Sequence, residues 1–506
     1  MTDGSPKRRV PPKITLVALL AIWLIALTAT HFGEDSPYSY GWAIFDNYTH
    51  LMYGVPTNPD ARFLIDFTYF FYEGAQVNWA QAQNLKLPLH SFSVSMAGAF
   101  THSYLASNLI VNVVFAVLVA LAAVTLALRW GTRPAATLVA LLSFFSLPLY
   151  VEYLGQPMQY IVGPAVSFIV VMSIVAFEPE DARNPWIAGL ATSILTLNYD
   201  PYVFLAALVT WFLFVSRFPR WRDYLFFAIA AGTPYVAWSR YLDFISDGQM
   251  TRHLHNTFIA PVLKAWVDFI TFPTENVLLP FIASHVGVHV AFHQIIAMIY
   301  WPLLFAALAL VVWLRPRIGT EKRFVLPALF PVFLFLEQIV AAGWDWELNP
   351  RRAIPVVLAF GFAYVYAVDR MWHSRTWRVT FVALMLLSMV LATADTLFRN
   401  PAMAFTRTGQ AMKLSPQEAI PVGYRRLGDR FTMRKYVPNS ETILWRDMGR
   451  ARKVPRERLG IFAATQALCL YLLLGMLWLA ARAKILPRWS PLAAAGVWVA
   501  SLVRFL

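Results

Sequence analysis

Residues 104–128 read YLASNLIVNVVFAVLVALAAVTLAL, and no side chain in this stretch carries a charge. A helix that crosses a bilayer needs about 20 consecutive apolar residues, because its backbone polar groups find partners only within the helix. Hydrophobic residues make up 58% of the 506-residue chain and charged residues 14%, whereas soluble proteins carry roughly 25% charged residues. So few charges cannot cover soluble domains, and the sequence predicts an all-α polytopic membrane protein.

Further uncharged runs bring the candidates to about thirteen, from which we expect 11–13 transmembrane helices. The additional runs are 14–30, 134–151, 156–177, 185–199, 201–216, 224–239, 294–314, 324–343, 353–368, 379–397, 460–481 and 489–503. Several are short, and the pair 185–216 is also compatible with a re-entrant hairpin. A secreted disulfide scaffold is excluded, because Cys469 is the single cysteine.

Basic residues indicate the orientation of the chain. Four of them, Lys7, Arg8, Arg9 and Lys13, precede the first run, and no small-residue cleavage motif follows Thr30. We therefore expect an uncleaved first helix with a cytoplasmic N-terminus. The short loops that alternation then places inside hold 20 Lys and Arg residues, against two in the short outer turns, as the positive-inside rule requires.

Three long segments fall on the outer side: 31–103, 240–293 and 398–459. The predicted organisation is a transmembrane core over 1–397, a basic extracytoplasmic segment over 398–459, and C-terminal transmembrane helices over 460–506. The basic segment holds 14 Lys and Arg residues against five acids. It either meets phosphate or anionic lipid, or is cytoplasmic if the orientation of the last third is inverted. Nucleic acid is the weakest explanation, since the segment lies between two spans.

The first outer segment supplies the candidate catalytic carboxylates, among them Glu34, Asp35, Asp46 and Asp66. The run 64–72 is apolar and aromatic, which predicts an amphipathic helix lying in the membrane interface. Partial desolvation there would raise the pKa of Asp66, which suits a general base at neutral pH. The alternative is that these acids only solvate the loop.

Two further polar sites lie in short outer turns. Asp200 precedes Pro201, so it either initiates a turn or is a functional charge at membrane depth. Arg351 and Arg352 stand directly before an apolar run. A guanidinium pair at a helix mouth can bind phosphate bidentately, although it can also anchor the helix to lipid headgroups or pair with nearby acids.

Other chemistries find little support in the sequence. His285, His289 and His293 recur at i, i+4 and i+8. Two histidines four residues apart can share a metal, but the outer two lie about 12 Å apart along a helix. We therefore expect structural or interfacial histidines, with metal binding and proton handling as the alternatives. The sequence contains no P-loop and no Gly-x-Ser-x-Gly motif. The apolar runs are nearly free of acids, whereas transporters place ionisable groups inside their spans.

The layout resembles the GT-C superfamily of membrane glycosyltransferases. Members have a basic N-terminus, one span and then a large outer loop with a catalytic carboxylate, often as Asp-x-x-x-Tyr before a Gly-containing turn. Residues 66–74, Asp-Phe-Thr-Tyr-Phe-Phe-Tyr-Glu-Gly, are similar, with Tyr69 one position early. The junction from Pro88 to Asn108 and the turn 349–355 also resemble the family. The acidic pair common after the first span is reversed here as Glu34-Asp35.

The resemblance implies sugar transfer from a polyprenyl-phosphate donor at the outer face of the membrane. Arg351 and Arg352 would bind the donor phosphate. A carboxylate, with Asp66 ranked before Asp35 and Asp46, would deprotonate an acceptor hydroxyl of a lipid-linked glycan, polysaccharide or protein, which inverts the anomeric carbon. Some relatives require a divalent metal ion; this sequence does not demand one.

Two other functions remain open: a non-catalytic GT-C-like membrane subunit, and a lipid-linked glycan transporter or polymerase. The expected partners are the polyprenyl-phosphate-linked sugar, its acceptor and membrane lipid, without nucleic acid. The single cysteine, the Ala- and Arg-rich composition and the lack of organelle signals indicate a multi-pass protein of a bacterial cytoplasmic (inner) membrane.

Overall fold

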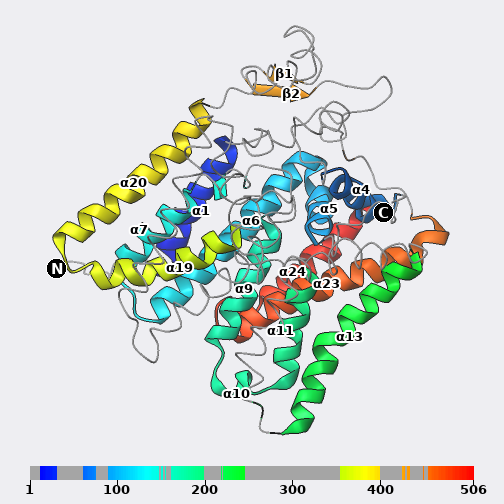
Figure 1. Cartoon of the computed structure of the whole chain (residues 1–506). Coiled ribbons are helices and arrows are strands. Elements are labelled where there is room, and N and C mark those ends of the chain that lie inside the picture. Colours follow the sequence, from blue (N-terminus) through cyan, green and yellow to red (C-terminus); the bar gives the residue numbers. More distant parts are fainter. Residues whose placement is uncertain are drawn as a thin grey trace, which may run out of the picture.

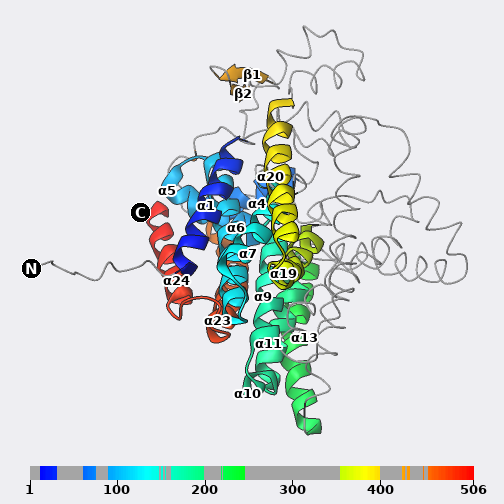
Figure 2. The ribbon, with the colours of Figure 1, turned by 90° about the vertical axis from the view of Figure 1, so that its left-hand side faces the viewer.

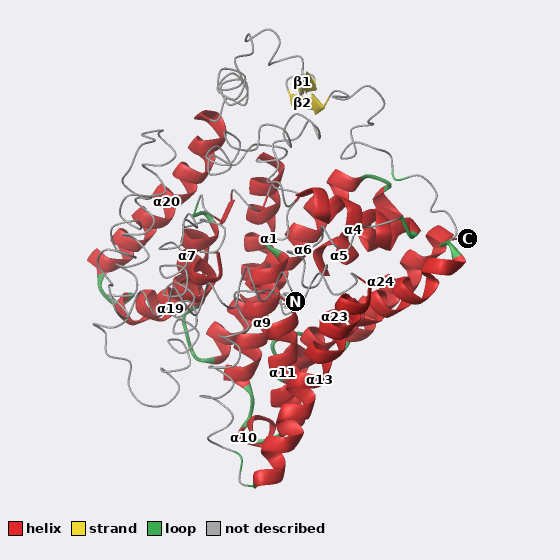
Figure 3. Cartoon of the chain, turned by 45° about the vertical axis from the view of Figure 1, so that its right-hand side comes forward, coloured by secondary structure: helices red, strands yellow, loops and turns green. Residues whose placement is uncertain are grey.

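The chain folds into a mostly helical structure, described here by a computed structural model (Figures 1 and 3). The described residues are 12–30, 61–75, 89–147, 150–151, 154, 161–198, 218, 220–245, 354–398, 424–427, 430–433, 448 and 454–505. The predicted helical fold is confirmed, with one exception. Within 398–459, β1 (Tyr424–Leu427) and β2 (Arg430–Met433) form an antiparallel hairpin that the sequence analysis did not predict.

Ten of the thirteen apolar runs coincide with helices of the structure. These helices are α1 (Pro12–Thr30), α6 (Tyr104–Arg129), α7 (Pro134–Phe145), α9 (Val162–Ala176), α11 (Pro185–Asn198), α13 (Trp221–Ile245), α19 (Ile354–Met371), α20 (Arg375–Phe398), α23 (Leu459–Arg482) and α24 (Ser490–Ser501). The runs 201–216, 294–314 and 324–343 lie outside the described residues. Within the described part, two stretches are long and apolar enough to cross a membrane, Ala106–Arg129 and Arg456–Arg482.

Shorter elements complete the description: α4 (Ala61–Glu73), α5 (Leu89–Thr101), α10 (Pro179–Ala182), η6 (Arg456–Arg458) and η7 (Leu502–Phe505). The run 64–72 is helical, as predicted, and forms most of α4. Its aromatic side chains are buried, however, and contact α5 and α23: Phe71 meets Phe92, and Phe70 meets Phe462. The aromatic face of α4 therefore packs against other helices of the protein, since large rings stabilise most when they are buried.

Helix α6 occupies the centre of the described helices (Figure 1). It packs against α1, α5 and α9, and Figure 2 shows α24 and α1 on one side of it and α13 on the other. Ser103 caps its start by accepting a hydrogen bond from the Ala106 N–H at 3.4 Å, which satisfies one of the free donors of the first turn. The helix ends before Gly131, whose φ of +88° is a conformation that glycine adopts without strain.

Glycines bring neighbouring helices into close contact. A Cβ atom at Gly361 of α19 would lie 2.9 Å from the Phe144 ring of α7, so no larger residue fits without a shift. Gly189 of α11 plays the same part against Ala230 of α13. Small residues at such crossings let backbones approach and increase the packing contact of apolar helices.

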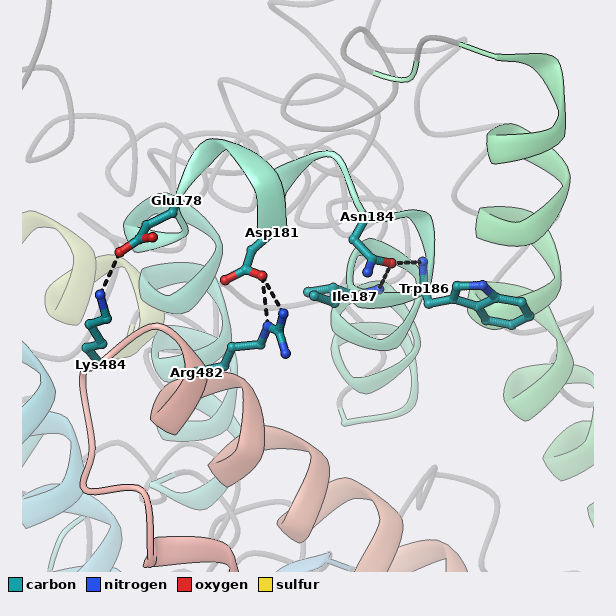
Figure 4. A network of polar contacts seen from close by, with 7 residues as sticks. All are labelled: Glu178, Asp181, Asn184, Trp186, Ile187, Arg482 and Lys484. Carbon is teal, nitrogen blue, oxygen red and sulfur yellow. Dashed lines mark hydrogen bonds and ion pairs between the residues drawn. The ribbon is translucent and has the colours of Figure 1, made fainter.

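One end of the helical assembly, which we call the basic end, consists of the turns 130–133, 177–184, 372–374 and 483–489. Figure 4 shows two ion pairs there. Lys484 Nζ lies 2.6 Å from Glu178 Oε1, and Arg482 Nη2 lies 2.7 Å from Asp181 Oδ1. Arg129 Nη1 donates to the Ala483 carbonyl at 2.9 Å. These contacts join the ends of α6, α9 and α23.

The turn between α6 and α7 also meets the turn between α19 and α20. The Arg133 N–H donates to Asp369 Oδ1 at 2.8 Å, and its guanidinium donates to the Asp369 carbonyl at 3.2 Å. The same guanidinium lies 2.6 Å from His373 Nε2. Four turns that are far apart in sequence therefore share one end of the molecule.

The opposite end, which we call the α4 end, contains Gly74, His102, Met448, Arg458 and Arg504. It lies at the start of α6, whereas the basic end lies at the finish of that helix. A helix of 26 residues is about 39 Å long at 1.5 Å per residue. The basic end thus joins turns that the sequence predicts inside, and the α4 end joins segments that it predicts outside.

Candidate functional site

The α4 end is the candidate site, because it holds the helix that carries Asp66. Helix α4 stops at Gly74, whose φ is +71°. The Gly74 N–H donates to the Phe70 carbonyl at 2.8 Å and the Ala75 N–H to the Tyr69 carbonyl at 3.4 Å. This is the left-handed glycine cap that satisfies carbonyls at a helix C-terminus. A Cβ atom at Gly74 would lie 2.8 Å from Val454 Cγ1, so the cap also accommodates the segment before α23.

Two arginines from the far end of the chain bind carbonyls at the C-terminus of α4 and at the glycine that follows it. Arg504 donates to the Phe71 carbonyl at 2.9 Å and to the Tyr72 carbonyl at 3.2 Å. Arg458 donates to the Gly74 carbonyl at 3.0 Å. The C-terminus of a helix carries partial negative charge, so cations are stabilising there. Burial lowers the pKa of Arg504 to about 10, which leaves the guanidinium charged at neutral pH.

Met448 links the segment 398–459 to the same place. Its N–H donates to the His102 carbonyl at 2.8 Å, and its own carbonyl accepts from the Tyr72 hydroxyl at 3.1 Å. The side chain is buried, and a Cβ atom at Gly98 of α5 would lie 2.8 Å from its sulfur. Backbone and side chain together thus fix this residue between α4, α5 and α6.

A buried pair of polar residues joins α5 to α6. His90 Nε2 lies 2.7 Å from Asn108 Oδ1, and Asn108 Nδ2 donates to the Tyr104 carbonyl at 2.8 Å. Because the amide nitrogen is used as a donor, Oδ1 is the acceptor and the proton sits on His90 Nε2. His90 Nδ1 is therefore an acceptor, and it has no hydrogen-bond partner within the described residues.

The pKa of His90 is lowered to about 4. Burial disfavours the charged imidazolium, and this outweighs the hydrogen bond to Asn108, which acts in the opposite direction. At neutral pH the side chain is thus an uncharged hydrogen-bond donor to Asn108. It can hold α5 against α6, but it is not a general acid near pH 7.

The sequence-predicted site residues are only partly placed. Asp66 belongs to α4, one turn before Phe70. Tyr69 is 9% exposed, and its ring packs within the hydrophobic core. Six candidates lie outside the described residues: Glu34, Asp35, Asp46, Asp200, Arg351 and Arg352. The predicted proximity of the first-loop carboxylates to the two arginines stays a prediction.

Sequence reasoning missed His90, Asn108, Arg458 and Arg504 as parts of this site. The sequence does carry a signal for Asn108, because Tyr104, Asn108 and Asn112 recur every four residues in a predominantly apolar run. Such a polar stripe in an apolar helix predicts a polar partner. Nothing local points to Arg504, whose contact with Phe71 spans 433 residues.

For a metal, the described residues contain no group of three or more His, Cys, Asp or Glu side chains that could share one ion. The histidines 285, 289 and 293 lie outside the described residues. Comparison of the chain with family models, with curated proteins and with solved structures finds no match.

Proposed function

We propose that the chain is a multi-pass protein of a bacterial cytoplasmic membrane, with its N-terminus in the cytoplasm. The separation of the two ends supports this placement. The basic end gathers the turns that the positive-inside rule assigns to the cytoplasm, and its two ion pairs lie within them. The α4 end gathers parts of 31–103 and 398–459 together with the C-terminus. About 39 Å of α6 between the ends exceeds a hydrocarbon core of about 30 Å.

We further propose that the protein transfers a sugar from a polyprenyl-phosphate donor to an acceptor at the α4 end, as the GT-C-like layout implies. The observation that carries the proposal is the anchoring of α4, the helix of Asp66, by Arg458 and Arg504. A catalytic carboxylate needs a rigid support, because a displacement of about 1 Å can reduce the rate about a hundredfold. Two guanidiniums on one helix terminus provide such a support.

In the proposed mechanism, a first-loop carboxylate removes the proton of the acceptor hydroxyl as the oxygen attacks the anomeric carbon. The bond from that carbon to the phosphate oxygen breaks, and the phosphate leaves against Arg351 and Arg352. Positive charge at the leaving group stabilises the transition state, because negative charge develops on the departing phosphate. Asp66 is the first choice for the base, with Asp35 and Asp46 next.

The test is single substitution of Asp66, Asp35 and Asp46 to Asn, followed by transfer of labelled sugar from a polyprenyl-phosphate donor in membranes. Glu73→Gln is the matched control, since Glu73 is an acid at the end of the same helix. Removing a general base lowers the rate by about a hundredfold or more. Full activity in all three Asn variants would leave the non-catalytic subunit as the better proposal.

The donor site has a separate test. Binding of a polyprenyl-phosphate analogue should weaken in Arg351→Ala and Arg352→Ala, because each arginine supplies charge-assisted hydrogen bonds to phosphate. Unchanged affinity in both variants would count against the phosphate site. A transporter is less well supported, since the space that the described parts of α6, α7, α9 and α19 line between them is apolar, with Phe145, Phe168 and Phe362 among its lining residues.

A further inference from the structure

Exposed tryptophans in the described part of the chain gather at the basic end. Each lies in, or directly before, a helix that starts or finishes there, within four residues of an arginine. The five are Trp186 of α11, Trp221 of α13, Trp377 of α20, Trp478 of α23 and Trp489 just before α24. The described residues of the α4 end contribute no exposed tryptophan. Tryptophan in membrane proteins concentrates at the headgroup level, where its ring is apolar and its N–H is hydrated.

The arginines beside these tryptophans are also exposed. Arg222 lies 5.8 Å from the Trp221 ring centroid, and Arg482 lies 5.4 Å from that of Trp478. Arg183 precedes Trp186, and Arg488 precedes Trp489. We call the five tryptophans and their neighbouring arginines the Arg–Trp collar. Two of its acidic neighbours, Glu178 and Asp181, already form ion pairs, and the Asp369 carboxylate accepts a hydrogen bond from the Arg133 backbone N–H.

The collar is most strongly basic at the start of α20. Arg375 and Arg378 are exposed, and the described structure gives them no acidic partner. They stand three residues apart and so share a face of the helix. Trp377 between them stacks on Phe381. The first turn of α20 contains no acid. The partial positive charge of the helix N-terminus therefore adds to the positive charge of the two guanidiniums.

Past this basic turn the outer surface of α20 is apolar. Val379, Leu386, Leu387 and Val390 are each more than half exposed. The same order recurs in α24, where Arg488 and Trp489 precede the exposed Leu492 and Val499. A cation, an exposed tryptophan and then an apolar face match the phosphate, the glycerol region and the acyl chains of a lipid.

We propose that the Arg–Trp collar binds anionic phospholipids of the cytoplasmic leaflet, with the principal site at Arg375, Trp377 and Arg378. The guanidiniums receive the lipid phosphate in bidentate hydrogen bonds, and the acyl chains lie along the exposed face of α20. Charge complementarity selects an acidic headgroup over a zwitterionic one. The inference rests on the membrane placement in the proposed function, but not on sugar transfer.

The experiment titrates phosphatidylglycerol into delipidated full-length protein in detergent, with the bound lipid counted by native mass spectrometry. The double variant Arg375→Gln, Arg378→Gln should bind about 30-fold more weakly, because each basic residue near anionic lipid contributes about fivefold in affinity. The matched control is Arg240→Gln, Arg456→Gln, which removes two exposed arginines away from the collar and should bind as the wild type does. Trp377→Ala should weaken binding without changing the charge.

Three outcomes would overturn the proposal. The first is equal affinity for phosphatidylglycerol in the wild type and the Arg375, Arg378 double variant. The second is binding of phosphatidylcholine as tight as that of phosphatidylglycerol, and the third is full displacement of the lipid by inorganic phosphate. Failure of the membrane placement would show separately, as release of the wild-type chain from membranes by alkaline carbonate. Failure of the sugar-transfer proposal would show instead in the Asp66, Asp35 and Asp46 variants and in the Arg351 and Arg352 variants.

Discussion

The buried imidazole of His90 makes the stability of the protein depend on pH. The side chain is 2% exposed, and its pKa lies at about 4 in the folded chain against 6.5 for the free side chain. Between these values the unfolded chain binds a proton at His90 and the folded chain does not. Protons therefore favour the unfolded state, and stability rises with pH across this window.

The size of the effect follows from the two pKa values. Each unit of difference corresponds to about 1.36 kcal/mol, so the free energy of unfolding should fall by about 3 kcal/mol between pH 6.5 and pH 4. His90→Gln should abolish this part of the pH dependence. A glutamine amide can still donate to Asn108 Oδ1, but it does not titrate, so the variant keeps the hydrogen bond.

The assay is the unfolding midpoint of the full chain in detergent micelles, measured from pH 4 to pH 7.5. Wild type should lose stability toward acid, whereas His90→Gln should show a flatter profile. His373→Gln is the control, because His373 is exposed at the basic end; it should behave as the wild type does. Identical slopes in the wild type and His90→Gln would refute the argument from burial.

Three further predictions concern the two ends of the helical assembly. Gly74→Ala should lower the free energy of unfolding by about 1–2 kcal/mol, through the positive φ and the contact with Val454; calorimetry that shows no loss would contradict it. Arg504→Met should cost about 2–3 kcal/mol and speed proteolysis after α4, because charged donors to buried carbonyls are lost; Arg504→Lys should recover part of this. Lys484→Gln should change the midpoint little at neutral pH, because both partners are exposed. The hydrogen bond from Lys484 lowers the pKa of Glu178, so any difference from the wild type should vanish in acid below the usual carboxyl range or in high salt.

The helices were predictable because each apolar run is a local property of the chain. The run 379–397, for example, lies within α20 (Arg375–Phe398), and 185–199 nearly coincides with α11 (Pro185–Asn198). The turns that meet at the basic end are also the ones that the sequence assigns to the same side, because Lys and Arg residues are concentrated in these short loops. Long uncharged segments have few alternatives to the helix, since helices satisfy their own backbone polar groups.

The packing of α4 was less predictable. Its helical conformation follows from the apolar run, but burial of Phe70 and Phe71 requires α5 and α23 as neighbours. An aromatic face that suits a membrane interface suits a protein core equally well. Only the position of the neighbouring helices distinguishes the two.

By itself, the sequence of this protein determined its helical class, the positions of most of the described helices and which of the described turns lie together at the basic end. These properties depend on hydrophobicity and charge within about 20 residues. The tertiary structure alone decided that Arg458 and Arg504 bind the end of α4, that His90 pairs with Asn108, and that five tryptophans form one collar. Such contacts join residues up to 433 positions apart, and they depend on how helices cross, which no local pattern specifies.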